Sequence, residues 1–397
     1  MKLITSVEQL KKAVWPQQQQ KLEELLAEEE KKGSHDLLKA VRHQVLAGGK
    51  RLRALIPIYV YRYLSELKHT SLQPQGASEN ASILDSGLFC PQRSFQCKGN
   101  INQYGPYTES SAEGKIIPNL GRYHFSDAPQ CEQAAQWLGL AAELIHSGTL
   151  CHDDIMDEDR TRRNVPTVWV LHGTAQAINA GDLLFYLGEE AVHRACLPAE
   201  LTTLLLRILA YSIRRVIQGQ ALEIEMHRDK QLPSLQSYYD VAIGKTGGLF
   251  ALAIAMGGAI VGYSGQEIER LQALGMKVGE IFQIQDDILD LLGNKGRDVP
   301  CSDLWEGKPS WLVAHAQSHL PNEERHELAR LLYIPRAKKT TGDVERIKQL
   351  LEKSGTFEFA RQWLAELPQA RLAVQQSFGD FGTLSADLME FIYVPIS

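Results

Sequence analysis

Apolar side chains recur at three- and four-residue spacings through most of this sequence. Such spacing places the apolar side chains along one face of an α-helix, whereas a half-buried strand would need strict alternation. Convincing alternation of that kind is absent from the sequence, so we predict an all-α protein built as a single large helical bundle. The expected helices cover residues 17–46, 174–193, 198–228, 235–264, 266–292, 308–319, 322–333, 342–353 and 357–376, and a further helix is expected to begin near Pro129 and to continue to Leu150.

One stretch, residues 69–130, lacks this pattern and is rich in Pro, Gly, Ser, Gln and Asn. A structureless loop of that length is unusual inside a compact domain. We therefore interpret it as a surface insertion that is partly disordered, and we expect Cys90 and Cys97 within it to be free thiols. A chain of 397 residues would suggest two or three domains from its length alone. With the insertion set aside, we predict one domain over residues 1–397.

Composition narrows the class of protein. The chain has 42 Lys and Arg against 48 Asp and Glu, a net charge of -6, which argues against a nucleic-acid partner. Six cysteines are too few for a disulfide scaffold in a chain this long, so a reducing, cytoplasmic setting is expected. The first fifteen residues show no apolar signal region. Residues 247–263 form the longest apolar stretch, and we interpret it as a buried core helix, so the protein is not expected to span a membrane.

A cluster of carboxylates, Asp153, Asp154 and Asp157, follows an apolar helical stretch. Positions four residues apart share a helix face, so Asp153 and Asp157 point the same way. Such a cluster is usually a solvated acidic surface. Here it lies at the end of an apolar helix, where the helix dipole disfavours negative charge, and this placement favours a functional site.

A second cluster, Asp286, Asp287 and Asp290, repeats the arrangement near the end of another apolar helix. If the six carboxylates converged without cations, each close pair would cost about 4 kcal/mol at an effective dielectric constant of 20. Either the clusters lie apart at the surface, or they face each other around hard cations. The apolar residues around the second cluster favour the latter, and all-oxygen ligands suit Mg2+.

A third feature is the basic segment at residues 48–53, GGKRLR, which precedes an apolar helix. Cations at a helix start oppose the dipole unless an anion binds there. Lys and Arg are the usual ligands of phosphate oxygens, although a basic surface turn is the alternative. Arg160, Arg162 and Arg163 add positive charge after the first acidic cluster. Together these features indicate a diphosphate with an apolar tail, held through Mg2+.

With these motifs, the sequence resembles the trans-isoprenyl diphosphate synthase (polyprenyl synthetase) family. The resemblance covers roughly residues 37–68 and 131–376. It implies an isoprenoid-synthase fold, with an all-α bundle around a central cavity, a homodimer, and head-to-tail condensation of isopentenyl diphosphate with an allylic diphosphate. The blocks that carry it are GGKRLR at 48–53, ELIHSGTLCHDDIMDEDRTRRNVPT at 143–167, AGD at 180–182, GKTGGL at 244–249, FQIQDDILD at 282–290 and SDLWEGK at 302–308.

The resemblance also implies roles for individual residues. Thr246 and Gln283 would face the allylic carbon and stabilise developing positive charge, with Lys245 beside them. For His146 the alternative is a satisfied core residue, because a histidine on an apolar helix is more often of that kind. The other implied roles are Mg2+ binding by Asp153, Asp154, Asp157, Asp286, Asp287 and Asp290, allylic diphosphate binding by Arg162, Lys245 and Lys308, and isopentenyl diphosphate binding by Lys50, Arg53, His146 and Arg163.

Product length depends, in this family, on residues just before the first aspartate cluster. These are Gly148 and Thr149, and neither is aromatic, so a C20 (geranylgeranyl) or longer product is expected, with C15 farnesyl diphosphate as the alternative. Phe185 and Tyr186 are candidates for closing the pocket deeper down.

Other classes fit less well. A terpene cyclase or a head-to-head synthase would leave GGKRLR without a purpose, and a non-catalytic partner subunit would commonly lack the aspartates. A binding role for the insertion is a further alternative. The family pattern is broken at Asn164, where Gly is usual, in the slightly long segment before EGK, and at the C-terminal end, which lacks a basic tail.

Overall fold

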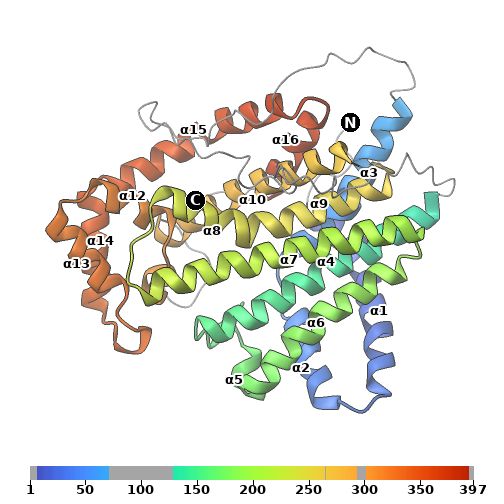
Figure 1. Ribbon diagram of the computed structural model, residues 1–397, viewed down its shortest axis with the longest axis horizontal. Coiled ribbons are helices and arrows are strands. Elements are labelled where there is room, and N and C mark those ends of the chain that lie inside the picture. The colour runs from blue at the N-terminus through green and yellow to red at the C-terminus, as the bar shows by residue number, and fades with distance from the viewer. Residues whose placement is uncertain (1–6, 71–127, 264, 293–300, 393–397) are drawn as a thin grey trace, which may run out of the picture. The chain divides into compact units, whose positions relative to one another are not determined.

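The computed structural model describes residues 7–70, 128–263, 265–292 and 301–392 (Figure 1). The predicted insertion, with Cys90 and Cys97, lies almost entirely outside these residues, since helix α3 ends at Thr70 and α4 begins at Ala128. Contacts between residues divide the chain into two compact units. In the described part, the first unit holds residues 7–70, 128–214, 249–263 and 265–275, and the second holds 215–248, 276–292 and 301–392. A single domain stays a prediction.

Both units are built from helices, which confirms the all-α prediction. The first unit contains α1 (Val7–Glu30), α2 (His35–Leu46), α3 (Leu52–Thr70), α4 (Ala128–Met156), α5 (Val168–His172), α6 (Thr174–Arg194), most of α9 (Gly248–Ile260) and the first parts of α7 (Ala199–Arg228) and α10 (Gln266–Leu292). The second unit contains the remainders of α7 and α10, with α8 (Leu235–Ala242), the π-helix η3 (Ile243–Gly247), α11 (Ser302–Glu306), α12 (Trp311–His319), α13 (Asn322–Leu332), η4 (Arg336–Lys338), α14 (Thr341–Lys353), α15 (Thr356–Ser377), η5 (Gly379–Phe381) and α16 (Gly382–Ile392).

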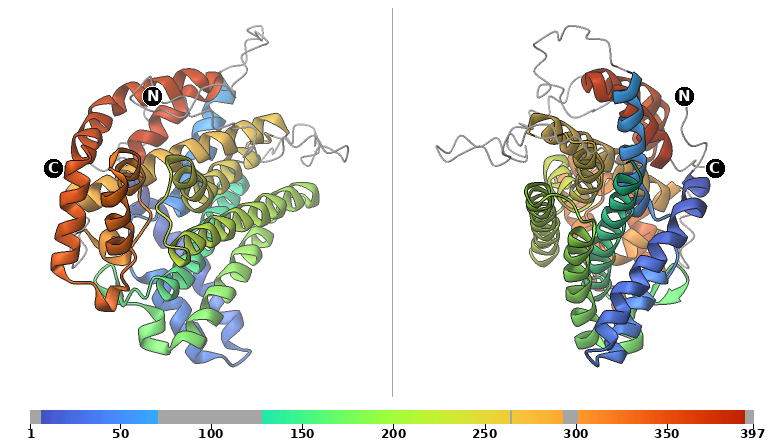
Figure 2. Two further views of the ribbon diagram at one scale, coloured as in Figure 1. Left: turned by 60° about the vertical axis from the view of Figure 1, so that its left-hand side comes forward. Right: turned by 90° about the vertical axis from the view of Figure 1, so that its right-hand side faces the viewer.

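Within the first unit, α4 packs most extensively against α6 and α3, and the views from two further directions keep α4 and α6 side by side (Figure 2). Glycines allow this close packing. A Cβ atom on Gly188 of α6 would lie 2.7 Å from Cδ1 of Ile145, and one on Gly139 of α4 would lie 2.2 Å from the carbonyl oxygen of Ala54. The apolar face of α4 that the sequence predicted is therefore the buried core of this unit.

Within the second unit, α12, α13 and α14 enclose an apolar cluster that includes Val313, Leu328 and Ile347 (Figure 1). Helix α14 begins with a capping box, in which Thr340 and Asp343 satisfy each other's backbone N–H groups. The cap therefore satisfies the first N–H groups of α14, and the buried apolar face of this helix packs in the cluster.

A short hairpin departs from the all-helical prediction among the described residues. Strand β1 (Thr161–Arg162) pairs antiparallel with β2 (Val165–Pro166). Each strand has two residues, and a strand this short shows no alternation that could be recognised in the sequence. Helix α16 was also not predicted.

One continuous helical stretch, Leu235–Ile260, is long and apolar enough to cross a membrane, and 89% of its most apolar window is buried. A mostly buried helix of this kind is ordinary for a protein core. The observation agrees with the interpretation of residues 247–263 as a buried core helix.

His315 on α12 is a buried histidine whose protonation is coupled to folding. Its Nδ1 lies 2.9 Å from Oγ1 of Thr356, and its ring stacks on His319 and on Phe359 with 4.0 Å between ring centroids. Burial and, to a lesser degree, the neighbouring His319 lower the pKa of His315 to about 4. The imidazole therefore stays neutral in the folded protein under conditions that protonate it in the unfolded chain.

We expect the free energy of unfolding to fall as the pH is lowered from about 6.5 to 4, by at most about 3 kcal/mol from this residue. In that window the unfolded state binds the proton and the folded state does not, so acid favours unfolding. Urea titrations at pH 7 and pH 4.5 should show a smaller pH effect in His315→Gln than in the wild type. An equal pH effect in both proteins would contradict the assignment, and His326→Gln, on the surface of α13, serves as the control.

Candidate functional site

The basic segment at residues 48–53 is a loop with three left-handed residues that leads into the first residues of α3. Gly48, Gly49 and Arg51 have φ values of +88°, +109° and +58°. A Cβ atom on Gly49 would lie 2.5 Å from Cζ of Arg163, and Arg163 donates a hydrogen bond to the carbonyl oxygen of Gly48. Nζ of Lys11 donates to the carbonyl oxygen of Gly49 at 2.7 Å. The glycines are therefore needed both for the backbone conformation and for the approach of Arg163.

The three cations of this loop differ in environment. Arg51 is buried, donates to Oε1 of Glu143 at 2.7 Å and stacks on the ring of Trp15. Lys50 is exposed, and Arg53 is half-buried with its guanidinium 4.7 Å from the ring centroid of Phe250. Arg51 thus anchors the loop, while Lys50 and Arg53 remain accessible to a ligand.

His146 of α4 lies buried among positive charges. Burial lowers its pKa well below the ordinary value, and Arg53, Arg163, Arg162 and Arg51 lower it further. Its Nδ1 has no hydrogen-bond partner among the described residues, so the alternative of a satisfied core histidine does not fit. A neutral imidazole surrounded by four guanidinium groups indicates a place suited to an anion.

The first acidic cluster lies at the C-terminal end of α4. Asp154 is buried, and its Oδ1 accepts a hydrogen bond from Nε of Arg162 at 2.5 Å. Its Oδ2 is buried with no hydrogen-bond partner in the described part of the chain. Burial raises the pKa of Asp154 to about 6, although Arg162 opposes the shift. Asp153 and Asp157 are half-buried, and a carboxylate oxygen of Asp157 lies within 4.8 Å of one of Asp159.

These donors fit a hard divalent cation. They are carboxylate oxygens, the ligands that Mg2+ and Ca2+ prefer, and the bare buried oxygen of Asp154 is a group that binding would satisfy. Metal binding by Asp153, Asp154 and Asp157 stays a prediction, and the bare oxygen of Asp154 is the observation that favours it.

The hairpin that follows explains the departure at Asn164. Arg163 and Asn164 form its two-residue turn with φ values of +54° and +62°. Asn is among the few residues besides Gly that adopt this left-handed conformation readily. Asn164 can therefore replace the usual Gly and still aim Arg162 at Asp154 and Arg163 at the basic loop.

In the second unit, η3 carries Lys245 and Thr246. A Cβ atom on Gly279 of α10 would lie 2.6 Å from Cα of Gly247, so the two helices meet at glycines. Oγ1 of Thr246 donates to Oε1 of Gln283 at 2.6 Å. Lys245 forms an ion pair with Glu223 of α7. Single-turn π-helices of this kind are frequent at functional sites.

The second acidic cluster is tied to the helix starts that follow it. Oδ1 of Asp287 accepts from Nε2 of Gln283, and its Oδ2 accepts from the backbone N–H of Trp311, both at 2.9 Å. Asp290 accepts from Oγ of Ser302 at 2.7 Å and from the backbone N–H of Asp303 at 2.9 Å. Asp286 is half-buried. Sequence reasoning did not foresee that Asp287 and Asp290 would also cap α12 and α11.

Lys308 follows α11 in the segment EGK. Its Nζ lies 2.7 Å from Oε2 of Glu306, and its backbone N–H donates to the carbonyl oxygen of Asp303 at 2.8 Å. Cys301 before α11 and Gly307 after it are both left-handed, with φ values of +58° and +76°. The slightly long segment before EGK, residues 296–303, lies mostly outside the described residues.

The residues expected to set product length lie beside α6. Gly148 is buried, and a Cβ atom there would lie 2.9 Å from the carbonyl oxygen of Gly181 and 3.0 Å from Cε1 of Phe185. Thr149 is half-buried and donates to the carbonyl oxygen of His146 at 2.8 Å. Tyr186 is 70% exposed. Phe185 therefore lies against the predicted pocket residues, whereas Tyr186 lies on the exposed face of α6.

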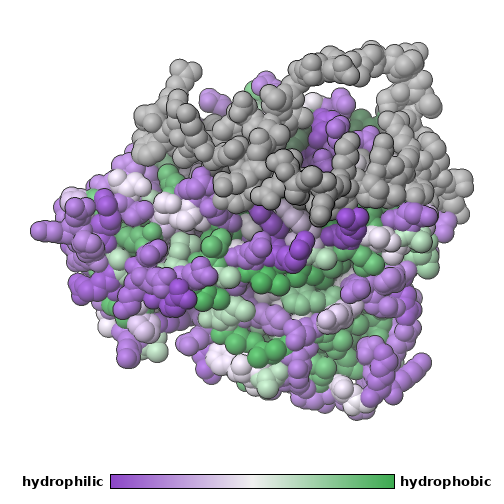
Figure 3. Space-filling view, in the orientation of Figure 1, coloured by the Kyte–Doolittle hydropathy of each residue, from purple (hydrophilic) through white to green (hydrophobic). Residues whose placement is uncertain are grey.

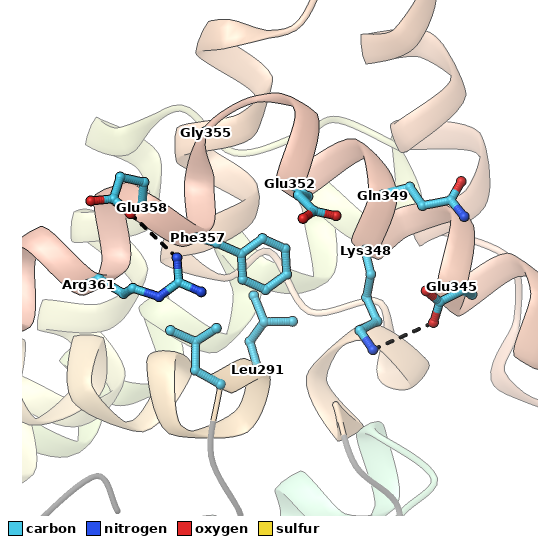
Figure 4. A pocket seen from close by; sticks show the side chains of 10 residues that line it. Leu291, Glu345, Lys348, Gln349, Glu352, Gly355, Phe357, Glu358 and Arg361 are labelled. Atoms are coloured by element: carbon cyan, nitrogen blue, oxygen red, sulfur yellow. Dashed lines mark hydrogen bonds and ion pairs between the residues drawn. The ribbon is translucent and has the colours of Figure 1, made fainter.

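Two surface hollows lie in the second unit, and neither contains a residue predicted for the site. One, of about 510 Å³, has Phe357 and Leu291 beneath a charged rim in which Lys348 pairs with Glu345 and Arg361 with Glu358 (Figure 4). The other, of about 500 Å³, is lined by α7 and by residues near η3. Mixed charges around a small apolar floor do not select one ligand chemistry.

The predicted site residues thus gather in two groups. The first unit holds Lys50, Arg53, His146, Gly148, Thr149, Asp153, Asp154, Asp157, Arg162 and Arg163, and the second holds Lys245, Thr246, Gln283, Asp286, Asp287, Asp290 and Lys308. Sequence reasoning missed the partners Glu143 and Glu223. Glu143 is a charged residue inside an otherwise apolar helix, and this was the one sequence signal for a buried cationic partner.

Comparisons with known proteins identify the family of this chain. The sequence model described as Polyprenyl synthetase matches residues 106–352. A short chain isoprenyl diphosphate synthase of Methanocaldococcus jannaschii is 38% identical over 215 residues, which are 53% of this chain and 63% of that protein. A geranylgeranyl diphosphate synthase of Saccharolobus solfataricus is 34% identical over 54% of this chain and 64% of its own. These matches span just under two thirds of the length of each relative.

Solved structures share the fold. A crystal structure of geranylgeranyl pyrophosphate synthetase from Pyrococcus horikoshii superimposes with a TM-score of 0.68 at 26% identity, and the match covers 97% of each chain.

Proposed function

Because this chain belongs to the polyprenyl synthetase family, we propose that it is a trans-prenyltransferase that condenses isopentenyl diphosphate head-to-tail with an allylic diphosphate. The observation that carries the proposal is the environment of α4, where neutral His146 lies among four arginines and the buried carboxylate of Asp154 follows within the same helix. Adjacent sites for an anion and for a divalent cation are what a metal-bound diphosphate substrate needs.

In the proposed reaction, the carboxylates of both clusters would hold Mg2+, which supplies neutralising charge to the departing diphosphate when bound. Arg162, Lys245 and Lys308 would bind the allylic diphosphate. Lys50, Arg53, His146 and Arg163 would bind isopentenyl diphosphate, and His146 suits this role because a neutral imidazole has one N–H group that can donate to a phosphate oxygen.

The reaction needs no protein nucleophile. Thr246 donates its hydroxyl hydrogen to Gln283, so its oxygen lone pairs remain available to stabilise positive charge on the allylic carbon. The proton lost after carbon–carbon bond formation would go to the released diphosphate, and no side chain is assigned as the base.

The test is incorporation of labelled isopentenyl diphosphate with allylic primers from C5 to C20, in the presence of Mg2+ and after its removal with EDTA. We expect turnover that depends on the metal. Absence of turnover with every primer would defeat the proposal. The non-catalytic subunit is not favoured as an alternative, because all six aspartates are present.

For product length we propose C20 or longer, which the name of the Saccharolobus solfataricus relative supports. Thr149→Phe should then shorten the main product by one or more C5 units, because the ring would fill space at the predicted end of the pocket. Gly148→Phe should act in the same direction, although Phe185 must first move. Mass spectrometry of the products is the measurement, and Thr203→Phe on the exposed face of α7 is the control. Unchanged products in both variants would show that Gly148 and Thr149 do not line the pocket that sets product length.

We also propose a cytoplasmic homodimer. Hydrophobic side chains lie at the surface of each unit (Figure 3). In the first unit, α6 exposes Ile178 and Tyr186, at 45% and 70%, and in the second unit the end of α7 exposes Ile217, Leu222 and Ile224. Large exposed apolar side chains of this kind are typical of surfaces that another chain covers. Sedimentation velocity measures the state directly, and a monomer at micromolar concentration would contradict this part.

A further inference from the structure

Lys339 is a buried lysine that no part of the proposed reaction uses. Only 6% of its surface is exposed, and it lies in the second unit between η4 and α14. Its Nζ donates to the carbonyl oxygen of Leu304 at 2.6 Å and to that of Leu332 at 2.7 Å. Leu304 belongs to α11 and Leu332 is the last residue of α13, so one ammonium group joins two helix C-termini.

Burial disfavours the charged form of this ammonium group. Burial lowers the pKa of Lys339 to about 8, with Asp343 and Glu306 opposing the shift and Arg336 adding to it. At neutral pH the group is therefore still charged. The two carbonyl oxygens compensate for the hydration that the ammonium group loses on burial. Removing the ammonium group would leave both buried carbonyl oxygens without this hydrogen bond.

The same segment contacts the EGK turn, residues 306–308, at two more points. A Cβ atom on Gly307 would lie 2.7 Å from the carbonyl oxygen of Leu332 and 3.2 Å from Nε2 of His227, so the turn is pressed against the end of α13. Arg336 lies 3.7 Å from Oε1 of Glu306, while Oε2 of Glu306 holds Lys308 at 2.7 Å. Residues 332–339 therefore hold the preceding helix α11 through Leu304, and they restrain the turn itself through Gly307 and Glu306.

We propose that Lys339 is a positioning residue for Lys308, and that it holds the EGK turn so that the Lys308 ammonium meets a metal-bound diphosphate. The proposal rests on the proposed function, because that function assigns Lys308 to the allylic diphosphate. Lys339 itself contacts only carbonyl groups of α11 and of α13 among the contacts described, so it is not a catalytic residue. Its effect passes through the backbone of Leu304 in α11, the helix that leads into the turn.

The test compares Lys339→Met with Lys338→Met. Methionine keeps an unbranched apolar stem but has no donor, and Lys338 is an exposed neighbour whose loss removes the same charge from the surface. In Lys339→Met we expect KM for the allylic diphosphate, and Kd for inorganic pyrophosphate with Mg2+ measured by calorimetry, to rise by about 10-fold or more, the usual effect of losing a group that orients a ligand-binding residue. KM for isopentenyl diphosphate should change less than two-fold. Lys339→Arg, which keeps the charge and the donors, should restore most of the pyrophosphate affinity.

Three outcomes would overturn the proposal: unchanged pyrophosphate affinity in Lys339→Met, an equal rise in both KM values, or the same loss in Lys338→Met. If Lys339→Met does not fold, Lys339→Gln replaces it, since glutamine is polar but lacks the charge and the length of lysine; unchanged pyrophosphate affinity there would overturn the proposal too. Calorimetry needs no turnover. A wild-type protein that binds pyrophosphate but condenses nothing would defeat the proposed function, while the Lys339 comparison would still decide the positioning role.

Discussion

Asp154→Asn is expected to lower kcat/KM for the condensation by about 10²–10³-fold, the loss typical of removing one group that stabilises charge in the transition state. The carboxylate of Asp154 is buried, and one of its oxygens is bound by Arg162 while the other has no hydrogen-bond partner in the described part of the chain. Asparagine conserves the volume but removes the charge that a divalent cation needs. It also leaves Arg162 without its main counter-charge.

The measurement is steady-state kinetics over a range of Mg2+ concentrations. Half-maximal activity should require more Mg2+ in Asp154→Asn than in the wild type. Glu158→Gln is the matched control, because Glu158 is an exposed carboxylate four residues further along the chain. Activity of Asp154→Asn within ten-fold of the wild type would show that this carboxylate does not hold the metal.

Glu143→Leu is expected to lower the free energy of unfolding by about 3–5 kcal/mol, because it leaves the buried guanidinium of Arg51 without a counter-charge. Both side chains of this ion pair are only 2% exposed. The double variant Arg51→Met with Glu143→Leu should be markedly more stable than Glu143→Leu alone, because a buried ion pair replaced as a whole leaves no unpaired charge.

Urea unfolding of the two single variants and the double variant measures this coupling. Glu29→Gln, which breaks an exposed ion pair with Lys32, should cost less than 1 kcal/mol and serves as the comparison. Additive losses in the double variant would contradict the coupling. In Glu143→Leu we also expect a higher KM for isopentenyl diphosphate, because Arg51 anchors the loop that carries Lys50 and Arg53.

The helices were the most predictable part of the fold. The stretches predicted over residues 266–292 and 198–228 correspond to α10 (Gln266–Leu292) and α7 (Ala199–Arg228) within one residue. Apolar spacing is a local property, and the residues that end a helix lie next to it in the chain. The π-helical turn η3 between α8 and α9 was not predicted, because it lies where Gly247 closely approaches Gly279, which is far away in the sequence.

The candidate site was predictable in its residue types but not in its contacts. Aspartate clusters at helix ends and the GGKRLR segment stand out because they contradict the helix dipole. The partners that hold them do not stand out. Lys339 is an ordinary lysine in a lysine-rich segment, and only the fold shows that it binds the carbonyl groups of Leu304 and Leu332.

The sequence by itself determined that the chain is helical, that its charged motifs suit diphosphate and metal, and that it resembles one enzyme family. All three conclusions rest on spacing or on residue identity within short segments. Only the tertiary structure decided that Arg51 is an anchor while Lys50 remains accessible, that His146 is neutral, and that Asp290 also caps α11. Those outcomes depend on burial and on partners distant in the chain. Desolvation and ion pairing act through space, so they cannot be predicted from the spacing of residues in the sequence.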